Sequence, residues 1–199
     1  EAGAQAIISL HVASPLSGIF NTAKMAAQEF GERVHVIDSH SISMGLGYQV
    51  LAAAEAIQQG ISLDQIQTQL ADFHPRIRVY AMLDTLENIR RSGRVSWVSA
   101  RLGSLLRIKL FVEVKDGSVL NLGQARTRKK AVEHLKGLIH KLGEVEKLTI
   151  LHSNAEADAR QILSDLNLNL GTPPFVVNVT PVIGTHVGPN GLGIAAVLK

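Results

Sequence analysis

Two serines and a glycine stand where a strand-like apolar run gives way to a helical pattern. The segment Ser14-Pro15-Leu16-Ser17-Gly18, which we call the serine turn, follows the apolar residues 6–12 and precedes apolar positions spaced as in a helix. The first amides of a helix have no partner within it and lie at the positive end of its dipole, so they donate readily to a carboxylate or phosphate. The serine turn therefore predicts an anion-binding site to which Ser17 adds a hydroxyl. The alternative is a plain serine cap of the helix.

A second concentration of unusual residues, the glycine-rich segment, spans residues 184–193 and carries four glycines and His186. Glycines let the backbone approach a ligand closely, and an imidazole can donate or accept a hydrogen bond near neutral pH. The glycine spacing matches neither the Walker phosphate loop nor the dinucleotide fingerprint. The segment predicts either a ligand-binding loop with a polar histidine or a plain connection between two strands.

Other kinds of site find less support. The remaining histidines show no metal-ligand spacing on one element, and no Gly-x-Ser-x-Gly pattern surrounds Ser17. The sequence has no cysteine, which excludes disulfides, thiolate metal sites and thiol nucleophiles and fits a reducing compartment. We therefore expect no metal and no cofactor, and a cytoplasmic location.

The charge of the chain is concentrated in its middle. Residues 76–130 hold 13 Lys and Arg against 4 Asp and Glu, whereas the rest of the chain holds 7 against 13. This basic stretch predicts an acidic partner surface or an anionic ligand, unless the charges are simply solvated. Nucleic acid is not expected as a partner, because aromatic residues make up only 4% of the chain and form no stacking platform. No apolar run approaches the roughly 20 residues of a membrane-spanning helix, so we expect no stable membrane insertion.

The elements that must position these residues alternate in an α/β order. Strands are predicted at 6–12, 34–37 and 76–81, and helices at 17–30, 45–59 and 63–73, the last opened by a capping box of Ser62 and Gln65. Asp84 and Glu87 form a second capping-box pattern, which predicts a short helix that ends at Gly93. Ser96 is positioned to cap another helix at 97–106.

The second half of the chain predicts a further α/β lobe. An Asp-Gly turn at residues 116 and 117 joins two strands, 109–114 and 118–122, into a hairpin. Helices at 127–142 and 154–166 and strands at 148–152, 175–179 and 194–198 follow. The predicted domains are residues 1–83, with a mostly parallel sheet and flanking helices, and residues 84–199, with a mixed sheet.

Several segments in this order resemble the DegV family of bacterial fatty-acid-binding proteins. The matching segments run almost end to end: Leu16-Ser17-Gly18 with Asn21-Thr22-Ala23, Val36-Ile37-Asp38-Ser39 with Met44-Gly45-Leu46-Gly47, Asp84-Thr85-Leu86 with Ser92-Gly93-Arg94-Val95, Gly103-Ser104-Leu105-Leu106-Arg107-Ile108-Lys109, Gln124-Ala125-Arg126-Thr127-Arg128-Lys129-Lys130-Ala131, and Gly184-Thr185-His186-Val187-Gly188-Pro189. The family also begins with a further segment, containing a Thr-Ser-Gln-Pro motif, that is not in this sequence. The resemblance therefore implies an N-terminally truncated chain.

The resemblance implies a two-lobed fold that encloses a long-chain fatty acid in an apolar tunnel. Ser17, Gly18 and His186 would hold the carboxylate, and a separate fatty acid kinase would phosphorylate it to an acyl phosphate for phospholipid synthesis. The chain itself would be a carrier and not an enzyme. Candidate tunnel-wall residues, each equally plausible as ordinary core, are Ile19, Phe20, Leu105, Leu106, Ile108 and Phe111. Candidate kinase-docking residues are Arg94, Arg126, Arg128, Lys129 and Lys130.

Two other functions stay open from the sequence. A phosphotransfer enzyme could use His186 as an acid, a base or a phosphate acceptor, although no nucleotide-binding loop or acidic pair accompanies that histidine. A regulatory lipid-binding protein is the other alternative. Detection of a phosphohistidine would favour the enzyme, and a pocket filled by side chains would favour a regulatory role.

Overall fold

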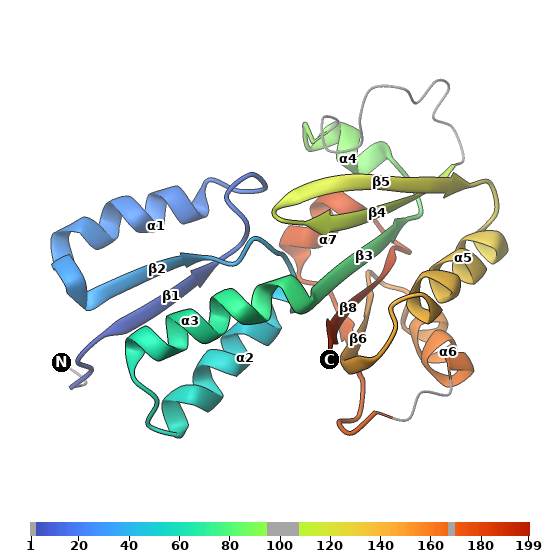
Figure 1. Cartoon of the computed structure of the whole chain (residues 1–199). Helices are drawn as coiled ribbons and strands as arrows, with labels where there is room; N and C mark the ends of the chain where they lie inside the picture. Colours follow the sequence, from blue (N-terminus) through green and yellow to red (C-terminus); the bar gives the residue numbers. More distant parts are fainter. Residues whose placement is uncertain (1–2, 95–107, 167–169) are drawn as a thin grey trace. The chain divides into compact units, whose positions relative to one another are not determined.

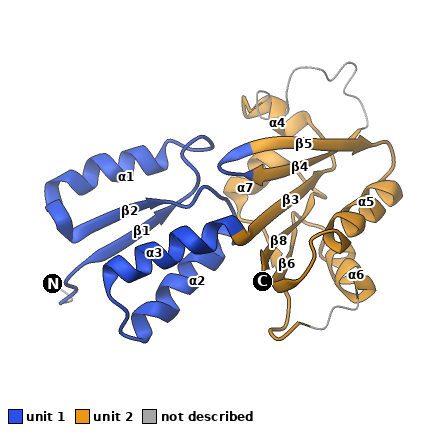
Figure 2. Cartoon of the chain, in the orientation of Figure 1, with its two compact units in different colours: residues 1–75, 115–118 blue, residues 76–114, 119–199 orange. Residues whose placement is uncertain are grey.

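A computed structural model describes residues 3–94, 108–166 and 170–199 of the chain. The chain forms two compact units (Figure 2). Unit 1 comprises residues 1–75 and 115–118, and unit 2 comprises residues 76–114 and 119–199. An α/β fold with a parallel first sheet and a mixed second sheet is confirmed.

Unit 1 is built on two parallel strands with helices on both faces (Figure 1). Its elements are β1 (Ile7–His11), α1 (Ile19–Ala27), the 3₁₀ segment η1 (Gln28–Arg33), β2 (Val34–Asp38), α2 (Met44–Gln58) and α3 (Leu63–Phe73). The capping box of Ser62 and Gln65 forms as predicted and opens α3. Ile66 and Leu70 of α3 pack with alanines of α2 in a buried cluster against the strands. No residue of α1 is buried.

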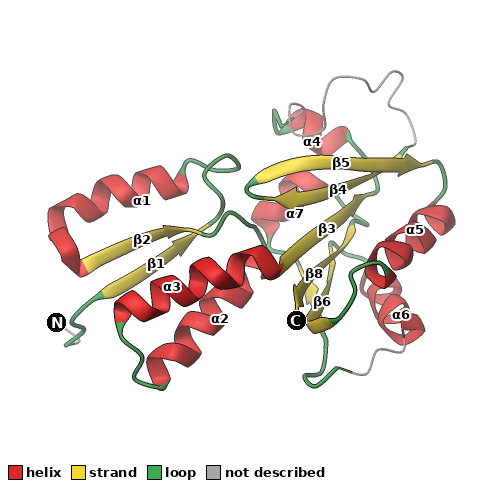
Figure 3. Ribbon diagram, in the orientation of Figure 1, coloured by secondary structure: helices red, strands yellow, loops and turns green. Residues whose placement is uncertain are grey.

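Unit 2 contains a six-stranded sheet of order β5-β4-β3-β8-β6-β7 (Figure 3). Its elements are β3 (Ile77–Leu83), α4 (Glu87–Arg91), β4 (Lys109–Lys115), β5 (Ser118–Ala125), α5 (Arg128–His140), β6 (Val145–His152), α6 (Glu156–Leu166), β7 (Phe175–Asn178), α7 (Pro181–Val187) and β8 (Leu192–Leu198); the 3₁₀ turn η2 (His74–Arg76) lies at its border with unit 1. The pair β6 and β7 is parallel, whereas β3 with β4, β3 with β8 and β6 with β8 are antiparallel.

The core of unit 2 follows the two-residue period of its strands. Met82 and Phe111 lie in one buried cluster with α5 and α6, while their neighbours Leu83 and Leu110 lie in another with α4. The central strand β8 is buried from Leu192 to Val197, as expected of a strand covered on both faces.

The unit boundary differs from the predicted boundary after residue 83. The strand at Ile77–Leu83 pairs with β4 and β8 and thus belongs to the second sheet. Residues 115–118, at the tip of the hairpin, belong to unit 1. The alternation of strands and helices along the chain does not reveal which strands pair with each other, because the paired strands lie far apart in the sequence.

Two local predictions have clear outcomes, and a third falls on residues that the structure does not describe. The hairpin turn is confirmed, since Asp116 at φ +48° and Gly117 at φ +74° both take the left-handed conformation of a type I′ turn. The second capping box is wrong, because α4 begins at Glu87 with Leu86 as its N-cap, and the Asp84 carboxylate pairs with Lys109 instead. The helix predicted at 97–106 lies outside the described residues.

The glycine-rich segment is only partly a loop. Its first half continues α7, which runs from Pro181 to Val187, and β8 begins at Leu192. His186 therefore lies in the last turn of a helix. None of the described helices is long and apolar enough to cross a membrane.

Candidate functional site

The serine turn of unit 1 is a hydrogen-bonded structure that leads into α1. The Ala13 carbonyl accepts the N–H groups of Leu16 at 2.9 Å and Ser17 at 3.2 Å. The Ser17 hydroxyl oxygen accepts the N–H of Ile19, the first helical residue, at 3.3 Å. A hydroxyl that accepts one hydrogen bond still has a proton to donate. Ser17 thus both begins the helix and offers a donor at its positive end, so the cap and the anion-site interpretations are compatible.

Asp38 anchors the serine turn to the end of β2. Its Oδ2 accepts the N–H of Ser14 at 3.1 Å, and its Oδ1 accepts the N–H of His40 at 2.8 Å. Burial raises the pKa of this carboxyl, but the hydrogen bonds from His40 and Ser14 outweigh burial, and the net pKa is lowered. The ionised carboxylate therefore fixes the start of the turn.

The hydroxyl of Ser41, which was not among the predicted site residues, is a buried polar group beside the serine turn. Ser41 is 3% exposed, and its carbonyl accepts the N–H of Ala13 at 2.9 Å. Among the described residues, no hydrogen-bond partner contacts the buried Ser41 hydroxyl. A buried polar group without a partner is costly, so it calls for a ligand or a water molecule. The only local signal is the nearby strand-end pair Asp38-Ser39, a common position for sites in α/β folds.

The tip of the β4–β5 hairpin packs against the serine turn within unit 1. The Gly117 N–H donates to the His40 carbonyl at 2.8 Å. A Cβ at Gly117 would lie 3.1 Å from Cδ of Pro15 and 3.3 Å from Cβ of Ala13. Asp116 lies 3.7 Å from Nε2 of His74. The hairpin tip therefore supports the serine turn, although the two segments lie far apart in the sequence.

His186 of unit 2 lies in an environment that favours the neutral imidazole. It is half-buried, and its pKa is lowered first by burial and second by the positive charge of Arg94. Arg94 thus acts on the predicted binding histidine, a role that the sequence did not suggest. A neutral imidazole near a cation is suited to an anionic ligand, which would interact favourably with both.

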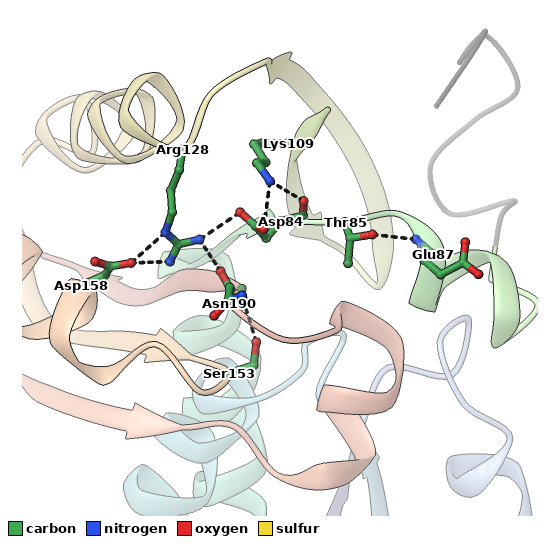
Figure 4. A network of polar contacts seen from close by, with 9 residues as sticks. Asp84, Thr85, Glu87, Lys109, Arg128, Ser153, Asp158 and Asn190 are labelled. Carbon is green, nitrogen blue, oxygen red and sulfur yellow. Dashed lines mark hydrogen bonds and ion pairs between the residues drawn. The ribbon is translucent and has the colours of Figure 1, made fainter. Parts of the chain in front are cut away.

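The segment that carries His186 is fixed at several points. The side-chain amide of Asn88 donates to the Thr185 carbonyl at 3.2 Å, and the Ser153 hydroxyl donates to the Gly188 carbonyl at 2.6 Å. Gly188 has φ +74°, and a Cβ there would lie 2.8 Å from Oδ1 of Asn88. This glycine therefore serves close packing within the protein. The polar network of Figure 4 continues from here to Arg128 and Asp84.

The structure places the predicted carboxylate residues in both units. In unit 1, Ser17 and Gly18 follow Ala13 and Ser14, whose N–H groups donate to Ser41 and Asp38. In unit 2, the charge of Arg94 acts on His186. In the described ranges no group of three His, Cys, Asp or Glu side chains could hold a metal.

The predicted tunnel-wall residues have different surroundings. Ile19 is 48% exposed and Phe20 is half-buried, both on α1. Ile108 packs against the cluster of Leu83 and Leu110, and Phe111 is buried in the other core cluster of unit 2 with its ring 4.2 Å from that of His134. Leu105 and Leu106 lie outside the described residues.

The predicted docking residues also differ. Arg126, Lys129 and Lys130 are exposed, whereas Arg128 forms ion pairs with Asp84 and Asp158. Three of the cations in this stretch are therefore accessible to an acidic partner.

Comparison with known proteins assigns the family. The family model described as "Uncharacterised protein, DegV family" matches residues 1–199. A DegV domain-containing protein of Deinococcus radiodurans is 36% identical over 200 residues, which cover 96% of this chain and 70% of that protein. The chain belongs to the DegV family.

Solved structures of the family agree with this fold. A DegV family protein from Thermus thermophilus, described by its fatty acid binding, has a TM-score of 0.88 and 33% identity over 99% of this chain and 72% of that one. DegV from Bacillus subtilis, described as a fatty acid binding protein, has a TM-score of 0.85 and 31% identity over 98% of this chain and 71% of that one.

Proposed function

We propose that this protein binds a long-chain fatty acid without chemical change and presents its carboxylate to a separate fatty acid kinase. The observation that carries the proposal is the match, over nearly the whole chain, to two DegV proteins that bind fatty acids. The serine turn and the His186 segment add groups of the right chemistry. The protein acts as a carrier, and the kinase supplies the phosphoryl transfer that yields an acyl phosphate for phospholipid synthesis.

The proposed carboxylate ligands are Ser17, Gly18 and His186, the residues that the family resemblance implies. A carboxylate loses much hydration on burial, so it needs several charge-assisted hydrogen bonds in return. The Ser17 hydroxyl and the amide of Gly18, the N-cap of α1, are suited to donate, and the buried Ser41 hydroxyl is suited to add another hydrogen bond. His186, whose imidazole feels the positive charge of Arg94, is the other proposed ligand.

The acyl chain supplies most of the binding free energy. Each buried CH₂ contributes about 0.8 kcal/mol, so a long chain retains ample affinity after the losses of association. Ile19 and Phe20, neither of which is fully buried, and Ile108 stay in the proposed tunnel wall. Leu105 and Leu106 remain in the proposed wall, whereas Phe111 already has core partners.

The kinase docks on the exposed basic residues that precede and begin α5. Arg126, Lys129 and Lys130 are exposed and carry three positive charges within five residues. Such a patch accelerates association with an acidic surface at low salt.

Binding of palmitate by the purified chain tests the proposal. We expect isothermal titration to show that Ser17→Ala weakens palmitate about 10- to 100-fold, the effect of a lost hydrogen bond to a charged group. Ser41→Ala should weaken it less, and Ser164→Ala, on the exposed face of α6, should leave it unchanged. A wild-type chain that neither retains fatty acid on purification nor takes up palmitate would refute the proposal.

A further inference from the structure

One arginine joins three segments of unit 2 that lie far apart in the sequence (Figure 4). Arg128 is the first residue of α5, and its Nη1 donates to Oδ1 of Asp84 at 2.9 Å and to the Asn190 carbonyl at 2.8 Å. Its Nε donates to Oδ2 of Asp158 at 2.8 Å, and Nη2 contacts the same oxygen. The planar guanidinium thus fixes the end of β3, the start of α6 and the turn before β8 in one geometry.

The stability of α5 does not explain why an arginine occupies position 128. A cation in the first turn of a helix opposes the helix dipole, and α5 has no acidic residue there to compensate. Thr127 already caps the helix, because its side chain accepts the N–H of Lys130. The contacts of the guanidinium are therefore the reason for an arginine at this position.

The partners of Arg128 are themselves held. Lys109 contacts Oδ2 of Asp84 at 2.9 Å and donates to the Asp84 carbonyl at 2.8 Å, and both side chains are less than 20% exposed. Two cations and two carboxylates balance in this network, so no net charge is buried. Partial burial makes such pairs stronger than exposed ones but costly to break on one side.

The turn at residues 188–191 connects Arg128 to His186. The Asn190 carbonyl accepts from Arg128, and the Asn190 N–H donates to the Ser153 carbonyl at 2.7 Å. The Ser153 hydroxyl accepts the Gly191 N–H at 2.9 Å and donates to Gly188, whose own N–H continues the hydrogen bonds of α7. Arg128 and Ser153 therefore hold the turn from two elements, two residues after His186.

We infer that Arg128 is a positioning residue, which holds the turn at residues 188–191 and thereby the His186 imidazole in place. This inference rests on the proposed function only where it assigns His186 to the fatty acid carboxylate. It takes Arg128 out of the kinase-docking set and gives it a role within the carrier.

Four variants distinguish a positioning role of Arg128 from a role in folding stability or in kinase docking. Arg128→Met removes the guanidinium and its charge. Arg128→Lys keeps the positive charge but removes the planar set of N–H donors. The double variant Arg128→Met with Asp158→Asn also removes the carboxylate left without its partner. Arg160→Met is the matched control, because it breaks an ion pair with Glu156 on the exposed face of α6.

We expect NMR to show shifted His186 ring resonances and shifted amide resonances of residues 184–191 in both single Arg128 variants, and palmitate affinity to fall about 10-fold. The double variant should regain thermal stability without regaining the His186 resonances or the affinity. Arg160→Met should leave all three readouts unchanged. Wild-type His186 resonances in Arg128→Met and Arg128→Lys, or their full recovery in the double variant, would overturn the inference. If the wild-type chain binds no palmitate, the proposed function fails, and the NMR result alone still decides the role of Arg128.

Discussion

Substitution of Gly117 at the hairpin tip should loosen the serine turn, and the structure gives the size of the effect. An L-residue at φ +74° costs about 1–2 kcal/mol of backbone strain. The added Cβ would also lie 3.1 Å from Cδ and 3.2 Å from Cγ of Pro15, well inside the usual contact distance of about 3.5–4.0 Å. Overpacking of this kind costs about 1–3 kcal/mol more.

Gly143→Ala is the matched control for this prediction. Gly143 has φ +81°, and a Cβ there would meet nothing within 4 Å, so this variant has only the backbone cost. Urea denaturation should show Gly117→Ala to be less stable than Gly143→Ala by about 1–3 kcal/mol. Hydrogen exchange should show faster exchange of the Ser17 amide in Gly117→Ala alone.

A second substitution separates the cost of backbone strain from the cost of overpacking. Pro15→Ala removes Cγ and Cδ, the atoms nearest to the added Cβ, so the double variant Gly117→Ala with Pro15→Ala should recover most of the difference. Equal stability of Gly117→Ala and Gly143→Ala, with unchanged exchange at Ser17, would refute the idea that the tip supports the turn.

Three other predictions follow from the site. The pKa of His186 is lowered, so the folded state favours the neutral imidazole. The free energy of unfolding should therefore be highest above the ordinary histidine pKa of 6.5 and should decline as the pH falls below that value. Urea unfolding between pH 7.5 and 5 should show this decline, and His186→Gln should make it smaller. Asp38→Asn should destabilise unit 1 and speed exchange of the Ser14 amide, and an unchanged Ser14 rate would show that the anchor is unimportant; because the pKa of Asp38 is lowered, its contribution should be lost only as the pH falls below 3.8. Arg126→Glu with Lys130→Glu should slow phosphorylation of bound palmitate by a fatty acid kinase at low salt without changing palmitate affinity, whereas Lys141→Glu, an exposed lysine just after α5, should not slow it.

The sequence predicted best what depends on near neighbours. The capping box of Ser62 with Gln65 and the turn at Asp116 and Gly117 each involve residues no more than three positions apart, and both formed. Thr180 and Pro181 are a helix-start signal of the same local kind, because proline is favoured at the first helical position. That signal could have placed His186 on a helix.

Features that depend on distant partners could not be predicted. Asp84 has the spacing of a cap, but Lys109 and Arg128, 25 and 44 residues further along the chain, take its carboxylate. Similarly, Gly117 contacts a turn 100 residues earlier, and nothing near Ser41 in the sequence shows that its hydroxyl is buried. The chemistry of the serine turn was readable from residue types, whereas its supports are tertiary contacts.

NMR of palmitate labelled with ¹³C at the carboxyl carbon shows whether the chain binds a fatty acid through its carboxylate. We expect a bound resonance distinct from free palmitate that does not titrate between pH 5 and 8, because hydrogen bonds hold the carboxylate in its ionised form. In Ser17→Ala with His186→Ala, that resonance should weaken and titrate. Absence of a bound resonance in the wild-type chain, or a bound resonance that the double substitution leaves unchanged, would show that the carboxylate is not bound in this way.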